Sequence, residues 1–347
     1  MGKPNIKMSF LCGNSWKNAP AYRFVLDNLL ALNEANSDFY IKVHNDSKKI
    51  DYSHYNVALF MGYDVKADLA KQQNRKIITG VFDPRAGQNI SFSNVDFIAV
   101  NDIEAKDYFS QFCDNDNILI YYLQPKLPPK TECPVSKEKF IIGYHGNKVH
   151  LDAMYPRITN AIERLATEIP LEFWAMSAWK DSEFWNKEKR LSFPIRYISW
   201  SQENYAKYIA NVDIGVVPQL MPIKYSQLLM YFIMSFGTKF NETKNDFIFR
   251  FKETTNRGRH LVFARYGIPV ISDMTPSACN FIDSDETSFL AYHTDAWYKA
   301  MRTLAHDKDR RKQMGKQFQE KYYQIASPEI QNEQLARFIR DSINNTV

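Results

Sequence analysis

The sequence predicts an α/β protein of two doubly wound domains that face each other across a cleft. In both halves of the chain, short apolar runs of strand length alternate with segments of helical spacing, the pattern of parallel sheets covered by helices on both faces. A proline-rich stretch, PKLPPKTECP (125–134), separates the halves, because proline continues neither a helix nor a central strand. The 347 residues are enough for two domains of ordinary size.

The first domain is predicted to span 1–124. A strand at 6–11 leads into the small turn Gly13-Asn14-Ser15, where a backbone without bulky side chains lets a substrate approach. An ordinary βα turn explains the same residues. A helix follows at 21–33, where Val25, Leu29 and Leu32 recur at helical spacing. The further strands of this domain are predicted at 39–43, 57–61, 77–82, 97–100 and 118–122.

A linker at 125–138 is predicted to join this domain to a second one at 139–325. The second domain begins with a strand at 140–144 and a helix at 155–169, whose apolar residues lie on one face. Its later strands are predicted at 171–176, 195–199, 214–217 and 270–271. The tail, 326–347, contains a predicted helix at 327–343.

Composition narrows the class of protein. The net charge of +5 suits phosphorylated substrates or an anionic membrane surface, and no basic motif typical of nucleic-acid binding is present. The four cysteines form no CxxC pair and fit a reducing cytoplasm. No apolar run is long enough to cross a bilayer, and the N-terminal apolar run is better explained as a strand than as a signal peptide. We therefore expect a cytoplasmic protein.

The most informative stretch is 254–273, TTNRGRHLVFARYGIPVISD. A polar, basic loop, Thr254-Thr255-Asn256-Arg257, runs into a helical segment that Gly267 ends, and a short buried strand follows. The start of a helix offers free backbone N–H groups and the positive end of the dipole, and Arg257 adds a charge. This arrangement suits an anionic ligand, although one ordinary α/β crossover explains it as well.

The segments around this stretch carry a resemblance to a known family. YAKYIANVDIGVVP (205–218) precedes it, and NFIDSDETSFL (280–290) and a basic helix with KDRRKQMGKQFQEKY follow it. This order, over 140–322, resembles the C-terminal half of two-domain GT-B-type glycosyltransferases, especially glycosyltransferase family 4 (group 1) and its relatives. The resemblance implies two Rossmann-like domains, an acceptor domain followed by a nucleotide-sugar donor domain, with the tail packing back on the first.

The resemblance also implies residues that bind the donor. Lys148 in the turn His145-Gly146-Asn147-Lys148 corresponds to the family's phosphate ligands, and His145 takes the place of the usual Arg. Trp200 lies at the nucleotide-base end and could stack on a base, although a core or surface Trp is the commoner outcome. Thr254, Thr255, Asn256 and Arg257 are expected to bind the diphosphate. The second of the family's paired glutamates is replaced by Val262.

The acceptor side is expected after the first-domain strands. Asp83, in Asp83-Pro84-Arg85, occupies the place of an element that lines this side in the family, where a carboxylate could deprotonate an acceptor hydroxyl. A turn in which Asp83 caps the next segment is the equal alternative. Arg85, Gly13, Asn14 and Ser15 complete the expected acceptor site, with Asp83 and Arg257 in catalytic roles. Asp102 is a weaker candidate that could simply cap a helix.

No metal and no cofactor is expected. Asp114-Asn115-Asp116 superficially matches a metal-binding Asp-x-Asp, but its polar setting favours a solvated turn. Gly13 alone does not make a GxGxxG fingerprint, so NAD is not expected.

The insertion at 220–252 is aromatic, rich in Met and basic. It suits a buried lid or a homodimer contact, and it also suits peripheral contact with the inner face of the plasma membrane through 221–252.

We therefore predict a hexosyltransferase-like, metal-independent and retaining glycosyltransferase. It would move a sugar from a nucleotide-diphosphate sugar to a glycan or lipid-linked acceptor in cell-surface polysaccharide biosynthesis. Two alternatives stay open: a nucleotide-sugar epimerase on the same fold, and a non-catalytic transferase-like subunit, which the missing glutamate favours.

Overall fold

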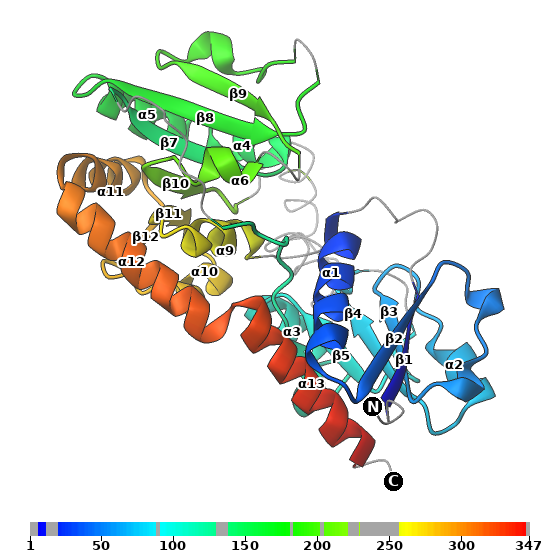
Figure 1. Ribbon diagram of the computed structural model, residues 1–347. Coiled ribbons are helices and arrows are strands. Elements are labelled where there is room, and N and C mark those ends of the chain that lie inside the picture. The colour runs from blue at the N-terminus through cyan, green and yellow to red at the C-terminus, as the bar shows by residue number, and fades with distance from the viewer. Residues whose placement is uncertain are drawn as a thin grey trace. The chain divides into compact units, whose positions relative to one another are not determined.

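The computed structural model describes residues 6–11, 20–87, 91–129, 138–180, 183–201, 205–220, 229 and 257–344. The chain divides into two compact units. Unit 1 comprises Met1–Lys126, Lys239–Gly258 and Ile325–Val347, and unit 2 comprises Leu127–Thr238 and Arg259–Gln324. Each unit contains one parallel sheet with helices on both of its faces (Figure 1).

The sheet of unit 1 has six strands in the order β2-β1-β3-β4-β5-β6, and all neighbours pair in parallel. Every residue of β3, β4 and β5 is buried, as expected for strands covered on both faces. The strands are β1 (Ile6–Leu11), β2 (Phe39–His44), β3 (Val57–Met61), β4 (Ile78–Phe82), β5 (Phe97–Val100) and β6 (Ile118–Ile120).

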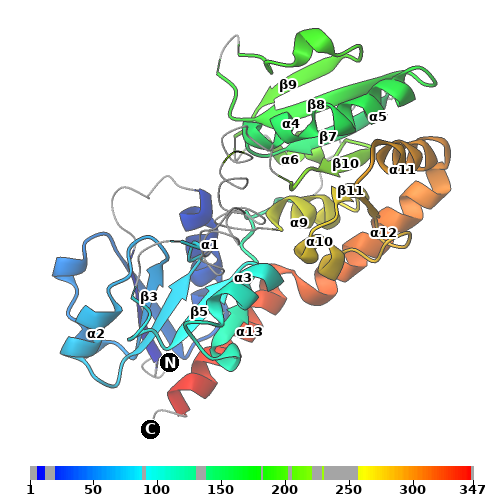
Figure 2. The same ribbon diagram turned by 180° about the vertical axis from the view of Figure 1, so that it is seen from behind.

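The chain returns to unit 1 at its end. The helix α13 (Pro328–Asn344) lies beside α1 (Pro20–Ala35) in both views (Figure 1, Figure 2). Leu335, Ala336 and Ile339 of α13 belong to the same buried cluster as the strands of the sheet. The other helices of the unit are α2 (Ala67–Gln73) and α3 (Ile103–Phe109). The tail is therefore an integral part of this core.

The sheet of unit 2 also has six parallel strands, in the order β12-β11-β10-β7-β8-β9. The strands are β7 (Phe140–His145), β8 (Leu171–Ser177), β9 (Ile195–Ser199), β10 (Ile214–Val217), β11 (Val270–Asp273) and β12 (Phe289–Ala291). The sequence does not predict β12, because its three residues are too few for a clear apolar period.

The helices of unit 2 cover both faces of this sheet. Figure 2 shows α4 and α5 in front of β7 and β8, and α6 lies on the opposite face (Figure 1). The helices are α4 (Lys148–Met154), α5 (Arg157–Ala166), α6 (Tyr205–Ile209), α9 (Gly258–Arg265), α10 (Pro276–Phe281), α11 (Thr294–His306) and α12 (Lys308–Ile325).

The predicted helix at 155–169 is wrong at both ends. Pro156 is the N-cap of α5, since proline has no N–H to donate in the interior of the predicted helix, and a separate helix, α4, ends before it. Within the described residues, no helix is both long and apolar enough to span a bilayer.

Candidate functional site

The strand order of unit 2 reverses between two neighbouring strands. From β7 the chain moves outward through β8 to β9, and from β10 it moves the other way through β11 to β12. In doubly wound sheets, ligands bind at the carboxyl ends of the strands where the order reverses. A ligand site is therefore expected at the residues that follow β7 and β10.

The loop after β7 is shaped by one glycine. Gly146 has a φ of +139°, and a Cβ there would lie 3.1 Å from Cδ of Arg259 and 3.1 Å from the Tyr144 hydroxyl. Its N–H donates to the Met176 carbonyl at 3.1 Å, which fixes the loop to the end of β8. Asn147 caps α4 by accepting from the Val149 N–H at 3.1 Å. A side chain at position 146 would fill the space that Arg259 occupies.

Arg259 is the basic residue that the structure brings to this point, and the sequence reasoning missed it. It lies in the first turn of α9 and donates to the Pro218 carbonyl, after β10, at 2.6 Å. It also shares a hydrogen bond with Tyr144, and burial lowers its pKa. One guanidinium thus links Tyr144, near the carboxyl end of β7, to the loop after β10. The feature of the sequence that could have identified Arg259 is its position just after the predicted loop 254–257.

His145 cannot supply a positive charge here. Burial, and then the neighbouring Arg259 charge, lower its pKa to about 3, so the imidazole is neutral at physiological pH. Its Nε2 lies 3.4 Å from the Arg259 carbonyl, and its ring packs edge-on against Phe263. His145 therefore supports the start of α9 rather than replacing an arginine.

Lys148 is held beside the same loop. Its Nζ lies 2.5 Å from Oε1 of Glu183 and 4.8 Å from the centre of the Trp179 ring. The hydrogen bond from Lys148 is the main reason that the Glu183 pKa is lowered. A phosphate that binds Lys148 must compete with this carboxylate.

A second unpredicted group lies at the ends of β11 and β12. Asp273 is fully buried, and its Oδ2 accepts from the N–H groups of Gln219 and Leu220 at 2.9 and 3.1 Å. Its Oδ1 lies 2.6 Å from one terminal nitrogen of the Arg157 guanidinium, and the other terminal nitrogen donates to the Tyr292 carbonyl at 2.6 Å. Asp273 thus fixes the loop after β10 and holds Arg157 at the same edge.

Trp200 follows β9 at the far end of this edge. It is 39% exposed, its backbone N–H donates to the Ser177 carbonyl at 2.8 Å, and its ring centre lies 5.8 Å from that of Tyr205. It is not a core residue, and its role as a platform for a base stays a prediction.

Arg257 is placed with unit 1. It is only 1% exposed, it donates to the Tyr122 hydroxyl at 2.9 Å, and its guanidinium lies 4.9 Å from the centre of the Tyr122 ring. These contacts anchor the chain just before α9. The expectation that Arg257 holds a donor phosphate stays a prediction. Gly13, Asn14, Ser15, Thr254, Thr255 and Asn256 lie outside the described residues, as does nearly all of the insertion 220–252.

Asp83 lies at the carboxyl end of β4 in unit 1. Its φ is +50°, which is uncommon outside glycine, and Asn101 donates to its Oδ1 at 2.6 Å. Burial raises its pKa to about 7, although the Arg85 charge and the Asn101 hydrogen bond act in the opposite direction. This carboxyl can therefore exchange a proton near neutral pH. Arg85 lies 5.2 Å from the centre of the Tyr63 ring.

Two other acidic candidates have structural roles. Asp102 caps α3 by accepting from the Ala105 N–H at 3.2 Å, as the simpler interpretation predicts. Asp114 begins a short exposed turn in which its carbonyl accepts from the Asn117 N–H at 2.8 Å. In the described ranges, no cluster of His, Cys, Asp or Glu could hold a metal ion.

Comparison with known proteins identifies the fold. No protein-family model matches the chain, and no curated protein matches it either. Solved structures do. HepE from Anabaena in complex with UDP matches with a TM-score of 0.65 and 11% identity, over 97% of this chain and 100% of that one.

Two further structures match over nearly the whole chain. A glycosyltransferase from Rickettsia africae has a TM-score of 0.64 and 9% identity, over 98% of this chain and 99% of that one. Sucrose-phosphate synthase from Thermosynechococcus elongatus has a TM-score of 0.63 and 10% identity, over 98% of this chain and 100% of that one. Similarity at such low identity shows the fold alone, and it confirms the predicted fold of two Rossmann-like domains of GT-B type.

Proposed function

We propose that this protein is a glycosyltransferase that takes a sugar from a nucleoside-diphosphate sugar. One observation carries the proposal: Arg259 links Tyr144, near the carboxyl end of β7, to the loop after β10, at the point where the strand order of unit 2 reverses. A fixed guanidinium at a ligand-binding edge suits a diphosphate. The matching structures that contain UDP or UDP-glucose have the same fold, which supports a nucleotide donor.

The donor diphosphate would bind along this edge. Arg259 and Lys148 would neutralise its charge, and the residues predicted at 254–257 would add contacts from the loop before α9. These groups would stabilise the negative charge that develops on the leaving diphosphate as the sugar–oxygen bond breaks. Trp200, 39% exposed, would stack on the base.

The acceptor would bind at the carboxyl end of the sheet of unit 1. There Asp83 would accept the proton of the attacking hydroxyl, because burial places its pKa at about 7, close to the working pH. Asn101, which donates to Oδ1 of Asp83 at 2.6 Å, would keep the carboxylate oriented. Arg85 and the turn 13–15 would contact the acceptor.

The finer features of the predicted reaction belong to the same proposal. We infer a hexosyl donor, transfer with retention and without a metal or cofactor, and a glycan or lipid-linked acceptor in cell-surface polysaccharide biosynthesis. The mild positive charge of +5 supports an anionic partner. We also infer a cytoplasmic location, with the basic and aromatic segment 221–252 meeting the inner face of the membrane.

A non-catalytic, donor-binding subunit is the second candidate, and one observation favours it. Val262, which takes the place of a glutamate in the resembled family, is 2% exposed inside α9. It therefore offers no carboxylate to a donor. Such a subunit would bind a nucleotide sugar but would not release the diphosphate in the presence of an acceptor.

Binding and turnover separate the two candidates. We would measure the thermal unfolding midpoint with UDP, GDP, CDP and their common sugars, since a specific ligand raises the midpoint by linkage. The base that gives a shift would then be used in an acceptor screen that follows release of the nucleoside diphosphate. Binding with acceptor-dependent release supports a transferase, and binding without release supports the subunit. The absence of any shift, in the presence or absence of acceptors, would contradict both.

A further inference from the structure

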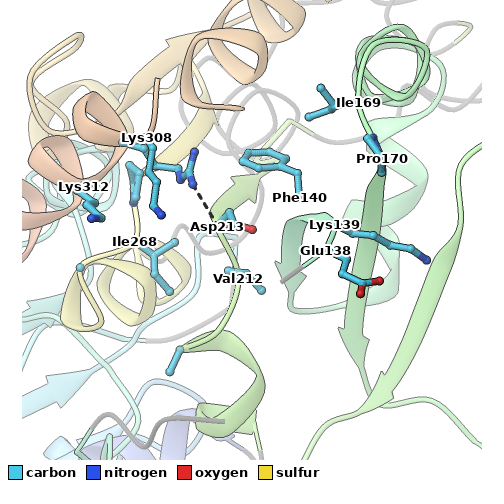
Figure 3. A pocket seen from close by; sticks show the side chains of 14 residues that line it. Glu138, Lys139, Phe140, Ile169, Pro170, Val212, Asp213, Ile268, Lys308 and Lys312 are labelled. Atoms are coloured by element: carbon cyan, nitrogen blue, oxygen red, sulfur yellow. Dashed lines mark hydrogen bonds and ion pairs between the residues drawn. The ribbon is translucent and has the colours of Figure 1, made fainter. Parts of the chain in front are cut away.

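A hollow in the described part of unit 2 lies at the opposite edge of the sheet from the candidate site. It has a volume of about 570 Å³ and is lined by residues at the amino ends of four neighbouring strands, β11, β10, β7 and β8. Phe140, Pro170 and Asp213 stand at three of these ends (Figure 3). This volume is within the range of small-molecule sites, roughly 300–1,000 Å³.

Basic side chains outnumber acidic ones in the lining, four to two. Lys308 and Lys312, one turn apart on α12, lie on one side of the hollow, with Phe140 between them and Lys139 (Figure 3). Of the two acidic lining residues, Asp213 is already engaged, because its Oδ1 lies 3.5 Å from Arg311 and its Oδ2 accepts from the Ile141 N–H at 2.9 Å. The hollow therefore retains an excess of positive charge.

Lys308 and Lys312 differ from the other basic residues of α12. Each of those others has an acidic partner within 4 Å: Arg310 with Asp285, Arg311 with Asp213, Lys316 with Glu320, and Lys321 with Asp283. Among the described residues, neither Lys308 nor Lys312 has such a partner. Like charges four residues apart on a helix repel each other, and an anion bound between them would relieve that repulsion.

The floor of the hollow is apolar. Val212 and Ile268 are almost fully buried, and the ring of Phe140 lies 5.3 Å from the guanidinium of Arg311. The N-terminus of α12 contributes little to anion binding, because the Asp307 carboxylate already accepts from the backbone N–H of Arg310 at 2.8 Å. The paired lysines and the hollow beneath them are therefore the features that select a ligand.

We propose that this hollow is a second anion-binding site, which takes a phosphate-bearing ligand between Lys308 and Lys312, separate from the carboxyl edge where the donor would bind. Charge-assisted hydrogen bonds from the two ammonium groups hold the phosphate. The apolar floor accommodates the part of the ligand that carries it. A soluble phosphate ester and the headgroup of an anionic phospholipid share this chemistry.

The test uses the full chain, inorganic pyrophosphate as the soluble probe, and vesicles of phosphatidylcholine with about 30% phosphatidylglycerol as the lipid probe. The variant is Lys308→Ala/Lys312→Ala. The control, Lys299→Ala/Lys316→Ala, removes the same charge from α11 and α12 at residues that do not line the hollow. Both pairs are exposed on helices, so the fold should be retained.

We expect the variant to weaken binding of one of the probes about tenfold or more, with the control within about twofold of wild type. In the soluble case, pyrophosphate should also shift the methyl NMR signals of Val212 and Ile268, which line the hollow. If the variant loses pyrophosphate binding, the natural ligand is a soluble phosphate ester. If it loses vesicle binding, the ligand is a phospholipid headgroup. Equal binding by variant and control with both probes, or no binding of either probe by wild type, overturns the proposal.

Discussion

The two sheets present opposite chemistry at their carboxyl edges. In unit 1 this edge offers Asp83, a buried carboxyl whose pKa is raised to about 7 and which Asn101 holds. In unit 2 it offers Arg259 and Arg157, two guanidiniums tied to backbone carbonyls at 2.6 Å each. A group that exchanges a proton near pH 7 suits the activation of a hydroxyl, and fixed cations suit the binding of an anion. In the proposed reaction, unit 1 would therefore carry the proton transfer and unit 2 the stabilisation of charge.

The largest effect is expected from Asp83→Asn. If Asp83 accepts the acceptor proton, its loss should lower kcat by about 10²–10⁴-fold and leave donor affinity unchanged. The wild-type rate should rise with pH through about 7, as the carboxyl ionises, and the residual rate of the variant should lack this rise. Rates and donor affinity between pH 5.5 and 8.5 test this. A variant with a wild-type rate and pH profile would remove Asp83 from the reaction.

The same substitution should stabilise the fold. The Asp83 pKa is about 7 in the folded state and about 3.9 in an unfolded chain, so between these values only the folded state holds the proton. Stability is therefore lost as pH rises from about 4 to about 7. Asp83→Asn should avoid this loss and be more stable than wild type at pH 8.5, by on the order of a few kcal/mol, with a smaller gain at pH 5.

Thermal or urea unfolding at the two pH values measures this difference. Asp114→Asn, in an exposed turn of the same unit, is the matched control and should leave the free energy of unfolding unchanged at both pH values. A gain that does not depend on pH would show that the charge of Asp83 is not its cause.

Arg259→Ala tests whether the carboxyl edge of the sheet of unit 2 binds the donor. Loss of a charge-assisted hydrogen bond to the diphosphate should weaken donor binding by about 1.5–3 kcal/mol, or roughly 10- to 150-fold. Arg265→Ala is the matched control, since Arg265 ends the same helix and lies 5.0 Å from the centre of the Tyr323 ring. Calorimetric titration with the nucleotide found in the ligand panel gives both affinities. Equal affinities would move the diphosphate away from α9.

Trp200→Ala should have the smallest effect. Loss of a stacking surface should cost about 1 kcal/mol of donor affinity, roughly fivefold, and Trp200→Phe should retain most of it. Phe184→Ala is a useful comparison, because Phe184 is 60% exposed and packs edge-on against Tyr197. If Phe184→Ala weakens donor binding and Trp200→Ala does not, the base stacks on Phe184 and not on Trp200.

The sequence by itself determined the class of fold. The alternation of apolar strands with helical segments is confirmed in both units, because burial on both faces of a parallel sheet leaves a strong local pattern. The sequence also placed Asp83 directly after a strand and Asp102 at the start of a helix. Turn and cap residues act on backbone groups only a few positions away, so their effect is visible locally.

Only the tertiary structure decided which residues meet. Arg259 reaches Gly146 and Pro218, and Asp273 reaches Arg157, across separations in the chain that leave no periodic signal. The pKa values of Asp83 and His145 depend on burial, which is set by neighbours from several elements. The basic hollow likewise arises where four strands and α12 converge. Local sequence fixes the elements, whereas charge and solvation at a site depend on packing between them.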